Sequence, residues 1–265
     1  MNEEQLVKQI KDIAIEASKI MLNREFSVDE KTGNCDLVTT NDIAVQKYLE
    51  PKLTELIEGS IFLGEEGDKT EHNAKYIWVV DPIDGTANYA LDLELSVISI
   101  ALLKNNEQYI GVVYNPYRKE TFHAIKGHGA FVNNNEIHVS NKDFKDSMFC
   151  SAMCLYEKKY AKKCFNIIEK VYMESMDLRR LGSAALEMCY LACGRADIYF
   201  EARLSCWDYA AATLIVKEAG GYAEFMFNEL MPLDRPCGII CANTKGNFEH
   251  LRNIVYEEIT EELFK

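Results

Sequence analysis

Residues 78–88 read Trp78-Val79-Val80-Asp81-Pro82-Ile83-Asp84-Gly85-Thr86-Ala87-Asn88 and form the most informative segment of this 265-residue chain. The apolar run predicts a buried strand that ends at Asp81, because Pro82 has no N–H group with which to continue a ladder. Asp84 follows after one turn, so two carboxylates stand close together at a corner of the chain. Such a pair can bridge hard cations, which prefer oxygen ligands.

Gly85 and Thr86 predict that a helix begins directly after these two aspartates. The first N–H groups of a helix lack intrahelical acceptors and attract anions, so a phosphate group suits this position. Either aspartate alone could be a helix cap. Metal ligands beside a phosphate cradle, however, predict a site for phosphate chemistry that uses a divalent cation.

Two further acidic segments accompany this motif. Gly64-Glu65-Glu66 ends a strand predicted at 61–64, and Asp208 stands near the start of an apolar helix predicted at 208–219. An acidic pair at a strand end is often a solvated turn, and Asp208 could be a cap or a partner of the helix dipole. From these residues alone, both alternatives stay open.

The remaining pattern divides the chain into two halves. The first predicts helices at 1–24 and 41–58, the second with Thr40 or Asn41 as N-cap, and strands at 61–64 and 76–80 before an antiparallel meander over 97–140. The second predicts helices at 156–174, 183–194, 208–219 and 247–263, which alternate with strands at 196–200, 222–225 and 239–242. We therefore expect an α/β (α+β) protein of two tightly packed subdomains, with 1–145 carrying the metal and phosphate motif and 146–265 contributing Asp208 and the substrate pocket.

Charge and hydropathy exclude several classes of partner. The net charge is −13, and Lys and Arg form no cluster that would attract nucleic acid. The acidic, helix-periodic N-terminus is unlike a signal peptide, and the longest apolar stretch, 97–103, is too short to span a bilayer. We expect a cytoplasmic protein with no nucleic-acid and no membrane partner.

The nine cysteines offer a zinc alternative, because three pairs have a spacing of four residues. Their neighbours are apolar and no histidine is suitably spaced, which favours buried thiols in a reducing compartment. These pairs are Cys150/Cys154, Cys189/Cys193 and Cys237/Cys241.

A dehalogenase-type phosphatase is a rival, since it also uses aspartates after a strand. Its nucleophilic and acid aspartates lie two residues apart. Here Asp81 and Asp84 are three apart with Pro82 between them, so this alternative is rejected.

Several motifs, in order from about residue 36 to 243, resemble the inositol monophosphatase family. They are Asp36-Leu37-Val38-Thr39 with Asp42, Gly64-Glu65-Glu66, Asp81-Pro82-Ile83-Asp84-Gly85-Thr86, Gly111-Val112-Val113-Tyr114, Lys126-Gly127-His128-Gly129-Ala130-Phe131, Gly182-Ser183-Ala184-Ala185, Trp207-Asp208-Tyr209-Ala210-Ala211 and Glu218-Ala219-Gly220-Gly221. The resemblance implies a layered α-β-α-β-α sugar-phosphatase fold, usually a homodimer, that hydrolyses phosphate monoesters with Mg²⁺ and is sensitive to lithium.

The resemblance also implies the roles of individual residues. Two to three Mg²⁺ ions are expected. Glu65, Asp81 and the carbonyl of Ile83 would hold the first, Asp81, Asp84 and Asp208 the second, and a weaker third would lie near Glu65. Thr86, hydrogen-bonded to Asp42, would orient the attacking water and help remove its proton. The amides of Gly85 and Thr86 would hold phosphate oxygens.

Substrate selection is implied by a third group of residues. Glu201 falls at the family's hydroxyl-binding carboxylate, and Gly182, Ser183 and Ala184 would line the pocket with Arg179 nearby. Arg203 departs from the family, because many inositol-selective members have a small or apolar residue there. Facing the pocket, Arg203 would accept a second anionic group; facing solvent, it has no role. Lys31, in a loop predicted at 29–34, is a further residue that could approach the metals.

Several substrates fit these residues: inositol monophosphate, other sugar phosphates, fructose 1,6-bisphosphate and the 2′-phosphate of NADP. The alternative from another class is a non-catalytic module that binds metal or phosphate. Loss of activity within a fold usually removes a ligand or the water-orienting threonine. All of Asp42, Glu65, Asp81, Asp84, Thr86 and Asp208 are present, which favours an enzyme.

Overall fold

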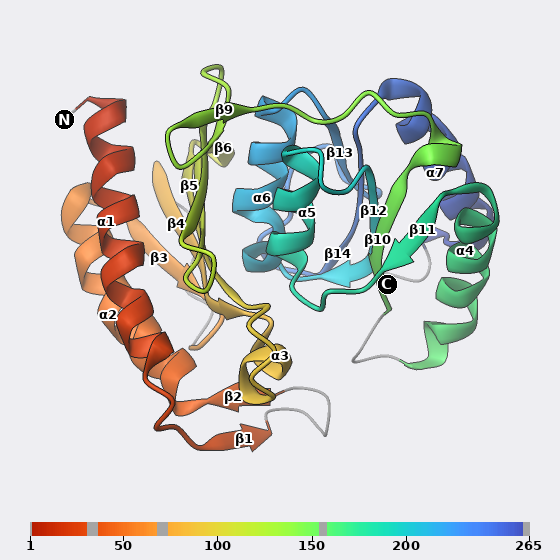
Figure 1. The fold of residues 1–265 in the computed structure, drawn as a ribbon. Coiled ribbons are helices and arrows are strands. Elements are labelled where there is room, and N and C mark those ends of the chain that lie inside the picture. Colours follow the sequence, from red (N-terminus) through yellow and green to blue (C-terminus); the bar gives the residue numbers. More distant parts are fainter. Residues whose placement is uncertain (1, 31–36, 68–73, 154–157, 262–265) are drawn as a thin grey trace.

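The computed structural model describes residues 2–30, 37–67, 74–153 and 158–261, which fold into five layers (Figure 1). Helices α1 (Glu3–Leu22) and α2 (Thr40–Leu56) form the first layer and a seven-stranded sheet the second. Helices α5 (Ala184–Ala192) and α6 (Cys206–Glu218) form the third layer. A five-stranded sheet is the fourth, and an outer pair of helices is the fifth. The predicted α-β-α-β-α arrangement is confirmed.

The seven-stranded sheet contains the predicted meander. Its strands follow chain order, with β3 parallel to β4 and each later neighbour antiparallel. They are β3 (Ile61–Gly64), β4 (Tyr76–Asp84), β5 (Val97–Lys104), β6 (Glu107–Asn115), β7 (Glu120–Ile125), β8 (Ala130–Val132) and β9 (Asn135–Ile137). The last strand ends at Ile137, so the predicted extension to residue 140 was wrong.

Alternation along β4 gives each face of this sheet its own core. Trp78 and Val80 pack with α1 and α2, whereas Ile77 and Val79 face α5 and α6. A central strand between two helical layers is apolar on both faces. This explains why residues 76–80 read as a continuous apolar run.

Strand β4 differs from the prediction at its end, since it continues through Pro82 to Asp84. Its pairing with β5 shifts register between Asp81 and Asp84. Proline cannot donate to a ladder and is tolerated at such an irregularity. The irregularity turns both aspartates toward the end of the sheet. The short helix α3 (Thr86–Ala90) then begins as predicted.

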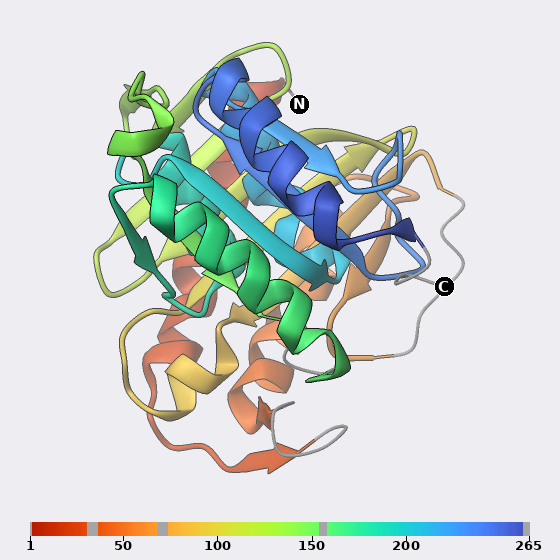
Figure 2. The same ribbon diagram turned by 90° about the vertical axis from the view of Figure 1, so that its right-hand side faces the viewer.

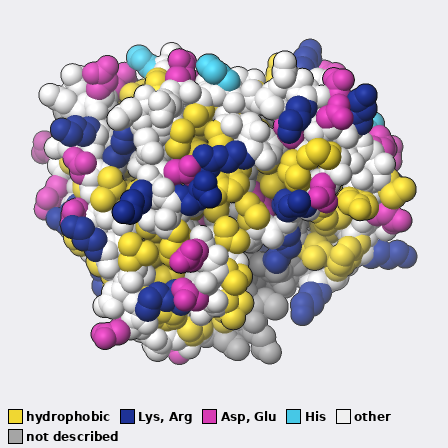
Figure 3. Space-filling model, viewed as in Figure 1, with side chains coloured by type: hydrophobic (Ala, Val, Ile, Leu, Met, Phe, Trp, Pro, Cys, Tyr) yellow, Lys and Arg dark blue, Asp and Glu magenta, His cyan; other side chains and the backbone are white. Residues whose placement is uncertain are grey.

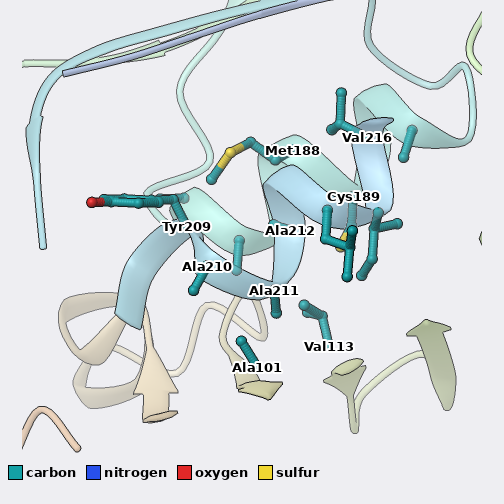
Figure 4. Packing of buried hydrophobic residues seen from close by; sticks show 14 of the residues in the cluster. Ala101, Val113, Met188, Cys189, Tyr209, Ala210, Ala211, Ala212 and Val216 are labelled. Atoms are coloured by element: carbon teal, nitrogen blue, oxygen red, sulfur yellow. The ribbon is translucent and has the colours of Figure 1, made fainter. Parts of the chain in front are cut away.

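The third layer approaches the first sheet through small side chains. Figure 4 shows Ala211 of α6 directed toward Ala101 of β5 and Val113 of β6, with Met188 and Cys189 of α5 beside it. Gly111 of β6 lies so close that a Cβ placed there would be 2.6 Å from the carbonyl oxygen of Ala211.

The five-stranded sheet is mixed and has the order β11-β10-β12-β14-β13. Strand β10 pairs in parallel with β11 and β12, and the other pairs are antiparallel. Helices α4 and α7 cover the outer face (Figure 2). The bounds are β10 (Met148–Ala152), β11 (Asp177–Arg179), β12 (Ile198–Leu204), β13 (Tyr222–Phe225), β14 (Cys237–Ala242), α4 (Ala161–Glu174) and α7 (Lys245–Glu258).

Four small elements complete the described chain. A two-stranded ribbon joins β1 (Val28–Glu30) and β2 (Leu37–Thr39), and two 3₁₀ helices span Phe144–Asp146 and Lys158–Tyr160. The first sheet lies within 61–137 and the second within 148–242, on either side of α5 and α6. The division near residue 145 stays a prediction. No described helix has the length and apolarity to cross a membrane.

Candidate metal centre and active site

Three aspartates from distant parts of the chain converge where β4 ends and α6 begins. Asp81, Asp84 and Asp208 each place a carboxylate oxygen within 4.8 Å of the other two. The bulged end of β4 positions the first two. The third lies in the first turn of α6, which packs across the same sheet.

Burial makes this cluster electrostatically unfavourable without a cation. Asp81 is 2% exposed and Asp84 6%. Burial, together with the charges of Glu65 and Asp84, holds the pKa of both Asp81 and Asp208 well above the ordinary value. Burial also raises the pKa of Asp84 to about 6, although hydrogen bonds from Ser183 and α5 oppose the shift.

The ion pairs among described residues include none of these three aspartates. Two buried aspartates and the partly buried Asp208, with no basic partner among the residues that the structure describes, fit a hard divalent cation such as Mg²⁺.

Glu65 and Ile83 lie at the edge of the same cluster. The amide of Glu65 donates to the carbonyl of Val80 at 3.2 Å, which places this residue beside the end of β4. Its charge acts on Asp81, Asp84 and Asp208. The amide of Ile83 donates to Asp81 Oδ1 at 2.9 Å, and its carbonyl oxygen lies 3.2 Å from Thr86 Oγ1. The structure therefore brings together the residues that the motif predicted as metal ligands.

The N-terminus of α5 holds Asp84 in place. Ser183 Oγ donates to Asp84 Oδ2 at 2.5 Å, and the amide of Ala185 donates to the same oxygen at 2.8 Å. The amide of Ala184 lies 3.3 Å from Oδ1. The sequence placed Ser183 and Ala184 only in the substrate pocket. Their contact with Asp84 was missed, because it joins residues about 100 positions apart.

Two site carboxylates also cap the helices that carry them. Asp42 Oδ2 accepts from the amide of Thr39 at 2.8 Å, and Asp208 Oδ2 accepts from the amide of Ser205 at 2.7 Å. Thr39 is the N-cap of α2, so the prediction of Thr40 or Asn41 was wrong. Asp208 is both a capping residue and a member of the cluster, and each cap fixes one oxygen of its carboxylate.

Asp42 also reaches across to α3. Its Oδ1 accepts a hydrogen bond from Thr86 Oγ1 at 3.2 Å, the contact that the family resemblance implied. Burial raises the pKa of the fully buried Asp42 carboxyl. Gly85 precedes Thr86 with a positive φ of +92°, and a Cβ there would be 3.1 Å from the carbonyl of Gly182. Only glycine is comfortable at this junction.

The predicted pocket residues differ in how they are placed. Glu201 is 7% exposed and accepts from Tyr199 Oη at 2.8 Å, and burial raises its pKa to about 8. Arg203 is half-buried in a register shift between Glu201 and Leu204, so strand alternation does not give its direction. Arg179 is exposed and pairs with Asp177 at 2.5 Å. Lys31 lies outside the described residues.

Glu187 of α5 is a buried acid that the sequence prediction overlooked. It is 1% exposed, and its Oε1 accepts the amides of Leu181 and Gly182 beside the Asp84 cradle. Burial raises its pKa to about 7. One signal was available, since Glu187 is the only charged residue within the apolar segment 184–192.

The face seen in Figure 3 and the described thiols give no second candidate site. In the view of Figure 3, basic and acidic side chains are interspersed. All seven described cysteines are free thiols. The group of potential metal ligands among the described residues is the aspartate cluster.

Comparison with known proteins places this geometry in a family. The model of the inositol monophosphatase family matches residues 2–260. The Nus factor SuhB of Xylella fastidiosa is 37% identical over 216 residues, which cover 79% of this chain and 78% of that protein. The Nus factor SuhB of Escherichia coli K12 is 36% identical over 191 residues, which cover 71% of this chain and 72% of that protein.

Solved structures agree with this assignment. The IMPase of Thermotoga maritima superposes with a TM-score of 0.82 at 30% identity, covering 96% of this chain and 97% of that one. The extragenic suppressor protein SuhB of Bartonella henselae gives a TM-score of 0.88 at 28% identity, over 96% and 100% of the two chains. With the aspartate cluster, the Thr86–Asp42 contact and the five layers in place, this chain belongs to the inositol monophosphatase family.

Proposed function

We propose that the protein is a Mg²⁺-dependent phosphomonoesterase that hydrolyses inositol monophosphate or a related sugar phosphate. The observation that carries the proposal is the cluster of buried Asp81 and Asp84 with partly buried Asp208, together with the Thr86–Asp42 contact. Cation ligands next to a group able to position water suit hydrolysis by direct attack on phosphorus.

The chain would hold two to three Mg²⁺ ions. Glu65, Asp81 and the carbonyl of Ile83 are the proposed ligands of the first; Asp81, Asp84 and Asp208 are those of the second. When bound, Mg²⁺ supplies Lewis acidity, which lowers the pKa of water and stabilises charge on phosphate oxygens. Inhibition by lithium follows from this family mechanism and is part of the proposal.

Thr86 and Asp42 are proposed to activate the water. Thr86 Oγ1 donates to Asp42 Oδ1, so its lone pairs are free to accept a proton from a neighbouring water. Burial raises the pKa of Asp42, which makes this carboxylate a better proton acceptor than an exposed aspartate. The two side chains therefore form a short relay for one proton.

A further group of residues is proposed to bind the substrate. The amides of Gly85 and Thr86 would hold phosphate oxygens, and Glu201 would accept a substrate hydroxyl, with Gly182, Ser183 and Ala184 beside it. Arg203 supports the alternative of a broader-specificity phosphatase for NADP or fructose 1,6-bisphosphate, because a second phosphate needs a cationic partner. Cytoplasmic location and a homodimer stay predictions.

The test is phosphate release from a panel of inositol 1-phosphate, other sugar phosphates, fructose 1,6-bisphosphate and NADP. We expect Mg²⁺-dependent turnover that falls when lithium is added, with inositol or sugar monophosphates preferred. Preference for the bisphosphate or NADP would favour the broader-specificity alternative.

A second candidate is a non-catalytic module that binds Mg²⁺ and phosphate. The observation in its favour is the printed name of relatives up to 37% identical, Nus factor, which is not the name of a hydrolase. Mg²⁺ binding without phosphate release from any member of the panel would support it.

A further inference from the structure

We propose that Asn41 and Tyr89 form a clasp that sets the spacing between Asp42 and Thr86, and that both are positioning residues for hydrolysis. The inference rests on the proposed function, since it concerns the relay that activates water. Asn41 directly precedes Asp42 in α2, and Tyr89 lies one turn after Thr86 in α3. The clasp therefore joins the two helices next to the pair that must meet.

Two buried hydrogen bonds and one partly buried hydrogen bond define the clasp. Asn41 Nδ2 donates to Tyr89 Oη at 2.7 Å and to the carbonyl of Asn23 at 2.6 Å. Tyr89 Oη in turn donates to the carbonyl of Met21 at 2.6 Å. Tyr89 is fully buried and Asn41 is 6% exposed, so water cannot readily replace these bonds.

The end of α1 anchors this arrangement. The last carbonyls of a helix have no intrahelical donor, and Asn41 and Tyr89 supply donors to them. Arg24, just beyond α1, donates to the carbonyl of Tyr89 at 2.7 Å and lies over its ring at 4.8 Å. Helices α1, α2 and α3 are thus tied at one point.

The hydrogen bond between Asp42 and Thr86 depends on a fixed position of α3 relative to α2. The capping bond from Thr39 already fixes one oxygen of Asp42, so this carboxylate cannot follow Thr86 if α3 moves. Helix α3 has five residues and no side-chain cap, so its position depends on contacts with neighbours. The Thr86–Asp42 distance of 3.2 Å is already long for O–H···O, and a small shift of α3 would break the contact.

The test begins with Tyr89→Phe, which removes the hydroxyl and keeps the ring. We expect kcat on inositol 1-phosphate to fall about 10-fold, as for other residues that orient a site from behind. KM and the Mg²⁺ concentration for half-maximal activity should not change, because substrate and metal ligands are untouched. The matched control is Tyr114→Phe, which removes from a buried tyrosine a hydroxyl that bonds to Ser18 of α1 and takes no part in the clasp. This variant should keep wild-type kcat.

A double-mutant cycle separates positioning from general damage. In a Thr86→Ala background, Tyr89→Phe should cause no further fall in kcat, because the contact it positions is already absent. In a crystal structure of Tyr89→Phe, the Asp42 Oδ1–Thr86 Oγ1 distance should exceed the present 3.2 Å, a readout that needs no activity.

Wild-type kcat in Tyr89→Phe, an equal fall in both backgrounds, or an unchanged distance would each overturn the clasp. A wild-type protein that binds Mg²⁺ but releases no phosphate would instead show that the proposed function has failed.

Discussion

Asp84 connects the two halves of the site, because it belongs to the aspartate cluster while Ser183 and the first amides of α5 hold its oxygens. Asp84→Asn keeps one oxygen as an acceptor for these donors but replaces an anionic ligand with a neutral amide. We expect kcat to fall at least about 100-fold, since outer-shell changes alone cost 10–100-fold. Steady-state kinetics at saturating Mg²⁺ will measure this.

The matched control for Asp84→Asn is Asp143→Asn, an exposed aspartate remote from the cluster, which should retain full activity. Near-normal turnover of Asp84→Asn at saturating Mg²⁺ would remove Asp84 from the metal site.

Substitution of Arg203 tests the alternative of a bisphosphate substrate against a monophosphate. If its guanidinium reaches the pocket, Arg203→Ala removes the partner of a second phosphate, so kcat/KM should fall about 10-fold or more for fructose 1,6-bisphosphate and little for inositol 1-phosphate. Competition between fructose 1,6-bisphosphate and inositol 1-phosphate in one assay measures the ratio of their kcat/KM values for the wild type and for the variant. An equal loss on both would show that Arg203 does not select the substrate.

For individual residues, the sequence predicted which residues belong to the site better than it predicted the contacts that hold them in place. Asp81, Asp84 and Asp208 were predicted as a group from their motifs, and the structure brings them together. The cradle of Ser183 around Asp84 and the bonds of Glu187 to the 181–182 amides were not predicted. Both depend on where α5 packs, which is a tertiary property that no local pattern encodes.

Helix α5 places the buried carboxylate of Glu187 at the amides of Leu181 and Gly182. The folded-state pKa of Glu187, about 7, lies above the ordinary value of 4.5. Folding is therefore favoured while this group is protonated, and the wild type loses stability as pH rises through about 7. Glu187→Gln keeps an acceptor for the two amides and carries no charge at any pH.

We predict that Glu187→Gln and wild type melt at the same temperature at pH 5 in a chelator. At pH 9 the variant should be more stable by roughly 2–3 kcal/mol, because it avoids a buried charge. Thermal unfolding at the two pH values measures this difference. The Glu187 charge also raises the pKa of buried Glu201, so its removal lets Glu201 ionise more easily and shifts the stability at pH 9 in the same direction. Equal melting temperatures at pH 9 would contradict the burial of an ionising Glu187.

Elements with strong periodicity and the four-residue strands β3 and β13 were predicted from the sequence, whereas strands β1, β2, β10 and β11 were not. The meander and the helices of the second half lie where expected, with ends shifted by a few residues. Strands β1, β2 and β11 have only three residues each, and β10 is a five-residue run that carries little alternation. Such strands owe their existence to pairing with neighbours rather than to their own sequence.

The whole molecule depends on the close approach of α6 to the first sheet, because this contact brings Asp208 to Asp81 and Asp84. A Cβ at Gly111 would be 2.6 Å from one backbone atom of Ala211 and 3.1 Å from another. Gly111→Ala should therefore destabilise the protein by about 1–3 kcal/mol, since the backbone of α6 must move. Its Mg²⁺ affinity should fall as well, because α6 carries Asp208.

The control for Gly111→Ala is Gly246→Ala in α7, where a Cβ meets no heavy atom within 4 Å. That variant should be slightly stabilised, because Gly246 lies in the first turn of α7 and alanine has a higher helix propensity than glycine. Chemical denaturation and calorimetric Mg²⁺ titration compare the two variants. Equal free energies of unfolding for the two variants would mean that α6 can move away from the seven-stranded sheet without loss of stability.

The most direct test of the central claim is phosphate release from inositol 1-phosphate by the purified protein during a Mg²⁺ titration, with Asp208→Asn measured in parallel. The proposed site predicts saturable activity that a chelator abolishes, that added Mg²⁺ restores, and that is lost in the variant. Hydrolysis that persists in the chelator, or that Asp208→Asn leaves unchanged, would contradict a catalytic metal centre at the three aspartates.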